Sequence, residues 1–379
     1  MKNILITGGA GFIGSNLALK LQKIGYNITV LDNLSKQIHG EEPINDSPLY
    51  KSIVEAKINF IKGSVTKRSN WIEALKNQDA VVHLAAETGT GQSMYQIKKY
   101  SDVNIGGTSL MLDILSNTTH SVKKLIIASS RAIYGEGKYL CSKDGIVYPL
   151  SREESFMNKG DFECKCPICG TEVSLEATDE ESIIHPSSVY AITKQVQEQM
   201  LLTVGKSIGI PSIAFRYQNV YGPGQSLSNP YTGIISIFST QIKNGNNINI
   251  FEDGKESRDF VYIDDVVDAT ILGLENNIVT NDVFNVGSNE AVDVLTIAST
   301  LKTNFNSDII IEISNNYRLG DIRHNYADLS KIKNKLSFTP KVDFQNGILK
   351  FCEWVNSQKI QKDNYSNAIK IMKRKGLYK

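Results

Sequence analysis

The sequence predicts an α/β protein built on a parallel sheet that is doubly wound, with helices on both faces. Short runs rich in β-branched residues alternate with helical patterns through the first half of the chain, which is typical of βαβ units. A glycine-rich turn, Thr7-Gly-Gly-Ala-Gly-Phe-Ile-Gly14, follows the first of these runs directly. The expected strands are Asn3–Ile6, Asn27–Leu31, Asn59–Ile61, Ala80–Leu84, Lys124–Ser129 and Ser212–Arg216.

The glycine turn predicts that this sheet is of the Rossmann type and binds a dinucleotide. Gly9, Gly11 and Gly14 satisfy G-x-G-x-x-G, and Gly8 begins the related G-x-x-G-x-x-G spacing. Glycines permit the tight turn, close approach of a pyrophosphate and close packing of the helix on the strand. Asp32 follows Gly14 by 18 residues at the end of the second strand, where a carboxylate hydrogen-bonds the adenosine ribose. Because it would repel a 2′-phosphate, Asp32 favours NAD over NADP.

The remaining elements complete an expected division of the chain. Long helices are expected at 93–117 and from Ser188 to Val204, and residues 282–287 form a strand that returns to the sheet. The expected units are an NAD-binding domain at 1–217, interrupted by a cysteine-rich insertion at 137–186, and a smaller, mainly substrate-binding α/β domain at 218–356. A basic tail follows at 357–379, and its charges are expected on a solvated helical face.

Composition describes an ordinary globular protein and excludes several classes of partner. The chain has 41% hydrophobic and 21% charged residues and a net charge of +1, which gives no reason to expect a nucleic-acid partner. The apolar runs are too short to cross a membrane, so no membrane partner is expected. The N-terminus reads as a strand rather than a signal peptide, and a cytoplasmic location is the expectation.

Tyr190 and Lys194 form a candidate acid/base pair. Four residues apart on one helix, the phenol and the ammonium share a face. A fixed cation beside a phenol is expected to lower its pKa from about 10. Such a spacing is common on helices, but downstream of the glycine turn it predicts proton-transfer chemistry next to a nicotinamide cofactor.

Together with Ser130, these motifs give the chain a resemblance to the extended short-chain dehydrogenase/reductases. Over roughly residues 1–355 it resembles their nucleotide-sugar epimerases and dehydratases, which use NAD. The resemblance implies that the Ser130 hydroxyl hydrogen-bonds the sugar oxygen that Tyr190 deprotonates. It also implies that Lys194 bridges Tyr190 and the nicotinamide ribose. The catalytic residues are therefore expected to be Ser130, Tyr190 and Lys194.

The same resemblance assigns the binding residues. The cofactor set is Gly8, Gly11, Phe12, Ile13, Gly14, Asp32, Asn33, Ser64, Val65, Leu84, Ala85, Ala86, Asn104, Tyr190, Lys194 and Tyr217. The substrate set, for a nucleotide-diphosphate sugar, is Thr88, Ser130, Arg131, Asn219, Asn229, Arg258, Arg318 and Asp321. Arginines suit a diphosphate because the guanidinium offers planar, bidentate donors.

One departure from the family pattern narrows the expected reaction. The 4,6-dehydratases carry Asp-Glu after the residue that matches Ser130, whereas this chain has Arg131-Ala132. Neither side chain can move a proton, so the resemblance implies C4 epimerisation through a transient 4-keto sugar. The substrate is a UDP-hexose or a dTDP-6-deoxyhexose, since the chain resembles the branch that converts dTDP-L-rhamnose to dTDP-6-deoxy-L-talose. Two alternatives remain: a nucleotide-sugar reductase or dehydrogenase using NAD(P) with net redox, and a non-catalytic NAD-binding regulator.

The insertion carries a candidate structural zinc site. Ser130 and Tyr190 stand 60 positions apart, and a loop this long without structure of its own is improbable in a compact domain. Cys166-Pro-Ile-Cys169 has the spacing of a zinc knuckle, which predicts a zinc-ribbon-like module. Cys141, Cys166 and Cys169 are expected ligands, with either Cys164 or Asp144 as the fourth and His185 as a weaker candidate.

The resemblance also implies a homodimer, because relatives dimerise through the helices that match 93–117 and 188–204. The sequence leaves three features of the substrate open. These are the identity of the sugar, the nucleotide base, and whether C4 or C2 is epimerised.

Overall fold

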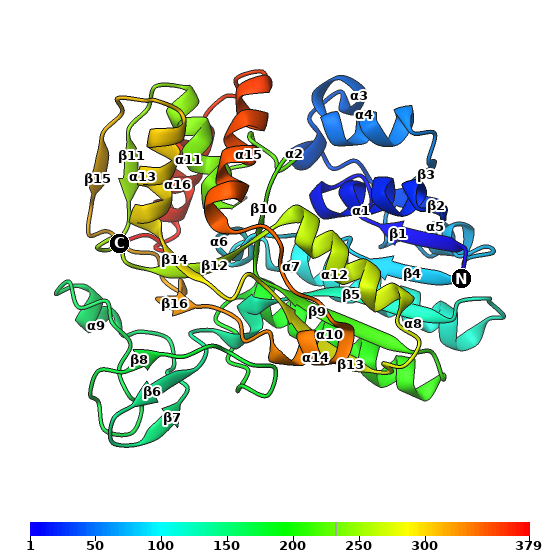
Figure 1. The fold of residues 1–379 in the computed structure, drawn as a ribbon, viewed down its shortest axis with the longest axis horizontal. Helices are drawn as coiled ribbons and strands as arrows, with labels where there is room; N and C mark the ends of the chain where they lie inside the picture. Colours follow the sequence, from blue (N-terminus) through cyan, green and yellow to red (C-terminus); the bar gives the residue numbers. More distant parts are fainter. Residues whose placement is uncertain (232) are drawn as a thin grey trace.

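A seven-stranded parallel sheet, built mainly from the first 217 residues, forms the centre of the fold (Figure 1). The computed structural model describes residues 1–231 and 233–379. From one edge to the other the strands are β13 (Asp282–Val286), β9 (Ser212–Tyr217), β5 (Lys124–Ser130), β4 (Ala80–His83), β1 (Asn3–Thr7), β2 (Asn27–Asp32) and β3 (Asn59–Lys62). The expected α/β fold is confirmed, and so is the return of residues 282–286 to the sheet beside β9.

The order of the strands creates a crevice at their carboxyl ends. β1 has β2 on one side and β4 on the other, so the chain reverses its direction of winding there. Ligands of doubly wound sheets bind at this switch point. β1 ends at Thr7, β5 at Ser130 and β9 at Tyr217, so the glycine turn and two predicted site residues reach the same edge.

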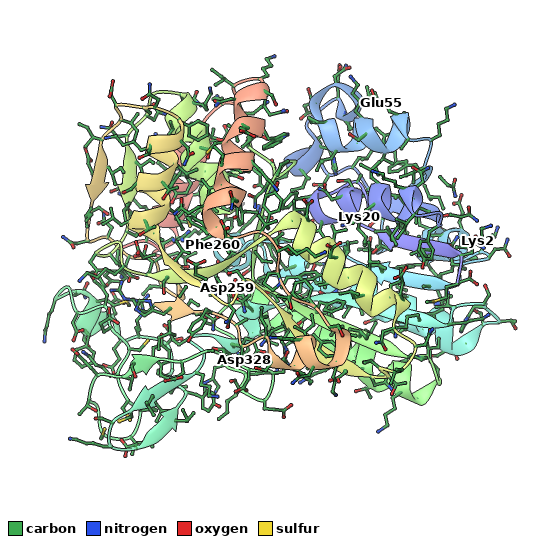
Figure 2. All side chains as sticks on the ribbon, viewed as in Figure 1. Lys2, Lys20, Glu55, Asp259, Phe260 and Asp328 are labelled. Atoms are coloured by element: carbon green, nitrogen blue, oxygen red, sulfur yellow. The ribbon has the colours of Figure 1, made fainter. Side chains whose placement is uncertain are left out.

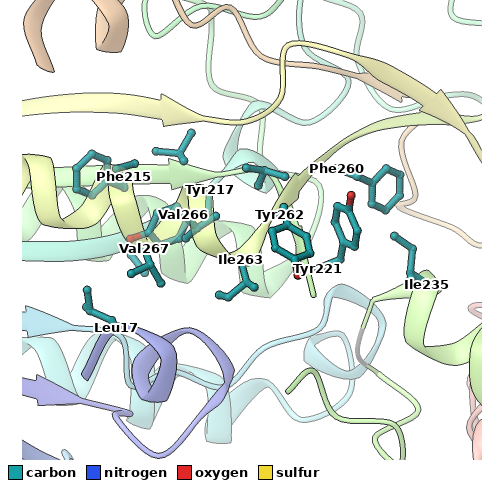
Figure 3. Packing of buried hydrophobic residues seen from close by; sticks show 14 of the residues in the cluster. Leu17, Phe215, Tyr217, Tyr221, Ile235, Phe260, Tyr262, Ile263, Val266 and Val267 are labelled. Atoms are coloured by element: carbon teal, nitrogen blue, oxygen red, sulfur yellow. The ribbon is translucent and has the colours of Figure 1, made fainter. Parts of the chain in front are cut away.

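Helices cover both faces because alternate strand residues point in opposite directions. Ile4 and Ile6 pack in one apolar cluster with α1 (Phe12–Lys23) and α12 (Ile263–Glu275). Leu5 packs in a second cluster with α5 (Arg68–Ala74), α8 (Gly107–Asn117) and α10 (Val189–Ser207). Figure 3 shows Val266 and Val267 of α12 among the aromatic rings of β9. Shorter helices are α2 (Lys36–His39), α3 (Pro43–Asp46), α4 (Pro48–Glu55), α6 (Thr90–Ser93) and α7 (Ile97–Tyr100).

The helix expected at 93–117 is interrupted. The chain leaves helical geometry between α6 and α7, and residues Ser101–Gly106 form a π-helical turn before α8 begins. This wide turn directs the side chain of Asn104 inward, where it is fully buried. Single π-helical turns are common near functional sites because they reposition one residue within a regular helix.

The C-terminal half contains smaller sheets and a group of helices. β12 (Ser257–Tyr262) pairs with β10 (Asn219–Tyr221), β14 (Ala291–Asp293) and β16 (His324–Asn325), and β11 (Ile248–Ile250) pairs with β15 (Ile311–Ile313). Asp259 of β12, near the centre of Figure 2, accepts backbone N–H bonds from Ser288 and Ala327 and so joins three segments. The helices are α11 (Ile234–Lys243), α13 (Val294–Asn304), α14 (Ser330–Leu336), α15 (Phe344–Ser357) and α16 (Tyr365–Arg374). Among the described residues, no helix is both long and apolar enough to cross a bilayer.

The C-terminal tail is more firmly attached than its basic composition indicates. Ala368 and Met372 of α16 are buried, while Lys370 and Lys373 on the same helix face outward. The last residues pair with the loop before β16, where Tyr317 and Lys379 exchange backbone hydrogen bonds of 3.1 and 3.0 Å. The expected solvated face is therefore one side of a helix whose other side packs on the protein.

The insertion forms a small sheet that projects from one corner of the molecule (Figure 1). Its strands β6 (Tyr139–Cys141), β7 (Gly145–Val147) and β8 (Ser174–Leu175) are joined with a single helical turn, α9 (Glu154–Met157). Buried charges attach it to the C-terminal half. Arg152 donates two bonds of 2.8 Å to Glu252, and the fully buried Arg323 donates to Glu163 at 2.6 Å and to Asp253 at 2.7 Å.

The buried carboxyl of Glu256, beside this charge network, predicts a pH-dependent stability. Burial, followed by the charge of Glu252, raises the pKa of Glu256 from 4.5 to about 7. The unfolded chain loses this proton above about pH 4.5 while the folded protein keeps it until about 7. Folding therefore carries a cost that grows as pH rises through this window.

Glu256→Gln removes this cost, so the variant should gain stability relative to wild type as pH rises from 5 to 8. A gain of roughly 1–3 kcal/mol is expected, since one pKa unit is worth about 1.4 kcal/mol. Urea unfolding at several pH values measures the difference, with the exposed Glu55→Gln as control. A difference that stays constant with pH would contradict the assignment.

Candidate active site

A cavity of about 550 Å³ runs along the carboxyl ends of the strands. Fifteen of the sixteen predicted cofactor residues line it: Gly8, Gly11, Phe12, Ile13, Gly14, Asp32, Asn33, Ser64, Val65, Leu84, Ala85, Ala86, Tyr190, Lys194 and Tyr217. Asn104 differs from the prediction. Its side chain lies behind the cavity wall, accepts the Glu87 N–H at 2.8 Å and donates to the Thr193 hydroxyl at 2.9 Å. Asn104 therefore braces the loop after β4 against α10.

The glycine turn leaves no room for side chains. A Cβ at Gly14 would lie 2.3 Å from the Gly8 carbonyl oxygen, and one at Gly8, whose φ is +67°, would lie 2.7 Å from the Ala85 nitrogen. α1 begins at Phe12 after a glycine, which has no side chain to cap the helix, so its first N–H groups point into the cavity edge. Such a terminus binds phosphate. Asp32 is held by N–H bonds from Ala10 at 3.1 Å and from Leu34 at 2.9 Å. These residues fit a dinucleotide.

Gly14→Ala is expected to weaken NAD binding by about tenfold or more, a cost of at least ~1.4 kcal/mol, because the turn must open to admit the methyl group. Calorimetric titration with NAD measures the loss. Gly106→Ala is the matched control, since its φ is −61° and the nearest contact of a new Cβ would be 3.8 Å away. Equal affinities in the two variants would show that the turn does not hold the cofactor.

The three predicted catalytic residues meet at the middle of this cavity. Ser130 ends β5, and Tyr190 and Lys194 lie in the first turns of α10. The helix begins there because the Ser188 hydroxyl caps it, accepting the Ala191 N–H at 3.2 Å. The Ser130 side chain lies close enough to Tyr190 to lower the pKa of the phenol against the rise that burial causes. The Lys194 ammonium donates to the Ala128 carbonyl at 2.8 Å, so it is anchored to the strand that ends in Ser130.

The charge balance around Tyr190 differs from the sequence-based expectation. Burial raises the pKa of the phenol, and the Ser130 hydrogen bond and then the Arg131 charge oppose that rise. Lys194 was expected to lower the pKa of Tyr190, and this expectation is wrong for this structure, since burial outweighs the contributions that lower the pKa. Burial disfavours the ammonium as well and lowers the pKa of Lys194 to about 7. Arg131, predicted only as a substrate contact, is therefore the cation that acts on Tyr190.

The predicted substrate residues fall into two groups. Thr88, Ser130, Arg131, Asn219 and Asn229 line the large cavity. Asp321 lines a second cavity of about 420 Å³, together with Glu136 and with His185 of the insertion. Arg258 and Arg318 lie outside both cavities as the described residues outline them.

Contacts within the second group explain this placement. Arg258 donates to the carbonyls of Ser257, Ile322 and Arg323 at 2.6–2.8 Å. Arg318 pairs with Asp321 at 2.7 Å. Burial and then the charge of Arg258 lower the pKa of Arg131 to about 9, which places these two guanidiniums near each other.

Several residues at the mouth of the cavity were missed by the sequence analysis. Gln37 of α2 donates to Asn229 at 3.2 Å and to Gln92 of α6 at 3.1 Å, which links three segments that are distant in sequence. His39 Nε2 lies 3.8 Å from Asp32 Oδ1, and burial lowers the pKa of His39. Polar side chains in loops distant in sequence give no pattern that a sequence alone could reveal.

The cysteine cluster in the insertion contains Asp144, one of the two expected fourth ligands, and not Cys164. Within the part of the chain that the structure describes, Cys141, Asp144, Cys166 and Cys169 have their ligand atoms within 4.8 Å of one another. The Cys164 thiol points instead to the Tyr139 hydroxyl at 3.4 Å. Asp144, the predicted alternative, takes the place of Cys164 in the cluster. His185, the weaker candidate, lies at the second cavity together with Asp321.

A nucleotide-binding sheet with a Ser-Tyr-Lys group at its switch point defines a class of NAD-dependent enzymes. The model of the "NAD dependent epimerase/dehydratase family" matches residues 4–152 and 167–287, and the chain belongs to this family. The dTDP-L-rhamnose 4-epimerase of Burkholderia thailandensis is 33% identical over 365 residues, which are 96% of this chain and 97% of that protein.

Solved structures agree with this assignment and confirm the resemblance drawn from the motifs. UDP-glucose 4-epimerase of Thermotoga maritima, with UDP-glucose, superimposes with a TM-score of 0.75 at 30% identity, covering 93% of this chain and 98% of that one. UDP-N-acetylglucosamine 4-epimerase of Methanobrevibacter ruminantium, with UDP-N-acetylmuramic acid, gives a TM-score of 0.74 at 29% identity, covering 94% and 99%.

Proposed function

We propose that this protein is an NAD-dependent nucleotide-sugar 4-epimerase. The observation that carries the proposal is the meeting of Ser130, Tyr190 and Lys194 in the same cavity as the glycine turn and Asp32. Arg131 and Ala132 follow Ser130, and neither can act as the acid or base of water elimination. The similarity to dTDP-L-rhamnose 4-epimerase favours a dTDP-6-deoxyhexose, converted from the L-rhamnose to the 6-deoxy-L-talose configuration, over a UDP-hexose.

In the proposed reaction the chain moves one proton and holds the sugar. NAD, when bound along the cavity, would accept a hydride from C4 of the sugar and return it. Tyr190 takes the proton of the C4 hydroxyl, and the Ser130 hydroxyl hydrogen-bonds the same oxygen. Burial opposes the phenolate that this step requires, and the Ser130 side chain and then the Arg131 charge act against that effect of burial. After the 4-keto sugar turns its opposite face to the cofactor, Tyr190 returns the proton. Arg258, Arg318, Asp321 and Asn219 are proposed to hold the diphosphate and sugar ring.

An assay without added cofactor distinguishes this reaction from its alternatives. Purified protein is incubated with dTDP-L-rhamnose, UDP-glucose and other nucleotide sugars, and the products are followed by NMR. An epimerase forms the C4 epimer without added NAD, because its net redox change is zero. A product that forms only with stoichiometric NAD(P)H or NAD(P) would indicate the reductase or dehydrogenase. Bound NAD without turnover of any sugar would indicate the regulator.

Four further assignments accompany the proposal. Residues 1–217 bind the cofactor and 218–356 most of the substrate. The protein forms a homodimer through the helical segments 93–117 and 188–204, which is supported by the exposure of Ile97 (54%) and Ile192 (45%) in these segments. A molar mass of one chain by light scattering would contradict the dimer.

Five free cysteines fit a reducing cytoplasm, which we propose as the location of the protein. The insertion is proposed to hold a structural zinc ion, argued from its side chains below.

A further inference from the structure

The insertion has too small an apolar core to fix its own fold. Its buried cluster consists of Tyr139, Cys141, Val147, Cys164 and Cys166, so three of its five members are cysteines. The sheet around this cluster has strands of only two or three residues. Modules of this size usually need a disulfide or a metal in addition to their core.

Two similar loops face each other at the tip of this module. One is the turn Cys141-Ser-Lys-Asp144-Gly145 between β6 and β7, and the other is Cys166-Pro-Ile-Cys169-Gly170. In each loop the backbone N–H two residues after the first cysteine donates to its sulfur at 3.4 Å, from Lys143 and from Ile168.

The ends of the two loops match as well. Each loop closes on a glycine in the left-handed region, with φ of +74° at Gly145 and +72° at Gly170. Asp144 therefore occupies in the first loop the position that Cys169 occupies in the second. The two loops are equivalent, and each presents two side chains that can ligate a metal.

The four side chains have the spacing of a tetrahedral site. Cys141 Sγ lies 3.6 Å from Cys169 Sγ, and Asp144 Oδ2 lies 3.3 Å from Cys141 Sγ and 3.1 Å from Cys166 Sγ. Two sulfurs bound to one zinc at 2.3 Å are about 3.8 Å apart. A disulfide would require about 2.05 Å. N–H bonds to the two sulfurs orient them and favour the thiolate that a metal needs.

We propose that Cys141, Asp144, Cys166 and Cys169 bind one structural zinc ion, with Cys164 excluded. A set of three thiolates and one carboxylate closes the tetrahedron, which is typical of structural rather than catalytic zinc. Cys164 faces the opposite side of the cluster, where its thiol contacts Tyr139. The zinc fixes the β6–β7 hairpin, which carries Tyr139.

The position of the hairpin predicts which ligand's binding should be affected by the loss of zinc. The Tyr139 hydroxyl donates to the His324 carbonyl at 3.4 Å. The neighbouring Arg323 carbonyl accepts from Arg258, one of the proposed substrate residues. The insertion also supplies His185 to the cavity beside Asp321, where Glu136 directly precedes the insertion. Loss of zinc should therefore raise the KM for the nucleotide sugar several-fold and leave NAD binding unchanged.

Elemental analysis of the purified full-length protein tests the site directly. About one zinc per chain is expected in wild type and in Cys164→Ser, and a loss of most of it in Cys166→Ser and Cys169→Ser. Cys164→Ser is a matched control because it makes the same substitution two positions from a proposed ligand. Asp144→Ala should release zinc to a chelator at least tenfold faster, and Asp144→Cys should retain it.

Wild-type protein alone also decides the question if the ligand variants fail to fold. Replacement of zinc by cobalt should give the intense visible absorption of a tetrahedral thiolate site, and thiol titration before and after metal removal should show three cysteines becoming reactive. Folded wild-type protein without metal, an intact disulfide among these residues, or zinc loss in Cys164→Ser comparable to that in Cys169→Ser would overturn the proposal. None of these outcomes depends on the sugar reaction.

Discussion

Tyr190→Phe is expected to reduce turnover by about 10²–10⁴-fold, the contribution typical of general acid–base catalysis. The substitution removes the phenolic hydroxyl that is proposed to take the proton of the C4 hydroxyl. The ring should stay in place, because it packs edge-on against Tyr100 with ring centroids 6.5 Å apart. Affinities for NAD and for the nucleotide sugar should therefore change little. The loss should appear in kcat rather than in KM.

NMR detection of the epimer measures the rate, and calorimetry measures the two affinities. Tyr26→Phe is the matched control, since its hydroxyl donates to Glu275 at the surface and lies outside the cavity. Wild-type turnover in Tyr190→Phe would falsify the proposed mechanism. A loss of NAD binding in the variant would instead assign Tyr190 a structural role.

The parts of the site that the structure brings together as expected depend mainly on local sequence. The glycine turn needs residues without a Cβ at fixed positions, and the 2.3 Å clearance at Gly14 shows why no other residue fits. Tyr190 and Lys194 share a face because they lie one helical turn apart. Ser130 reaches them because β5 ends there. The glycine turn and the Tyr190–Lys194 pair are each set by a few neighbouring residues, so a sequence contains them, whereas Ser130, 60 positions before Tyr190, was found through the family resemblance.

The parts that were missed depend on contacts between distant segments. Asn104 was expected at the cofactor, but the π-helical turn directs it to Glu87. Arg258 was expected beside the substrate diphosphate, and no sequence pattern indicated that three backbone carbonyls hold its guanidinium. The pKa of Tyr190 depends on how much burial opposes the phenolate, and spacing along a helix does not report burial. Cys164 and Asp144 were equivalent candidates in the sequence. In the structure the Cys164 thiol contacts Tyr139, whereas Asp144 lies in the turn between β6 and β7 beside the cysteine cluster.

The same dependence on distant contacts makes Arg323 the position with the largest expected effect on stability. Its guanidinium is fully buried and donates to Glu163, Asp253 and Glu252, at 2.6, 2.7 and 3.0 Å. Its backbone N–H donates to Glu136 at 2.6 Å. One side chain therefore joins the insertion, which supplies Glu163, to the C-terminal half, which supplies Glu252 and Asp253.

Arg323→Met is expected to lower the free energy of unfolding by about 3–5 kcal/mol, because removal of one partner leaves buried carboxylates without a compensating cation. Arg68→Met, which removes an exposed ion pair with Asp113, should cost only about 0–1 kcal/mol. Urea unfolding followed by circular dichroism measures both. Adding Glu163→Gln to Arg323→Met should recover part of the loss, since the second change removes one of the unpaired charges. If the double variant is less stable than Arg323→Met, repulsion between the carboxylates is not the cause, and lost packing of the arginine side chain must account for the effect.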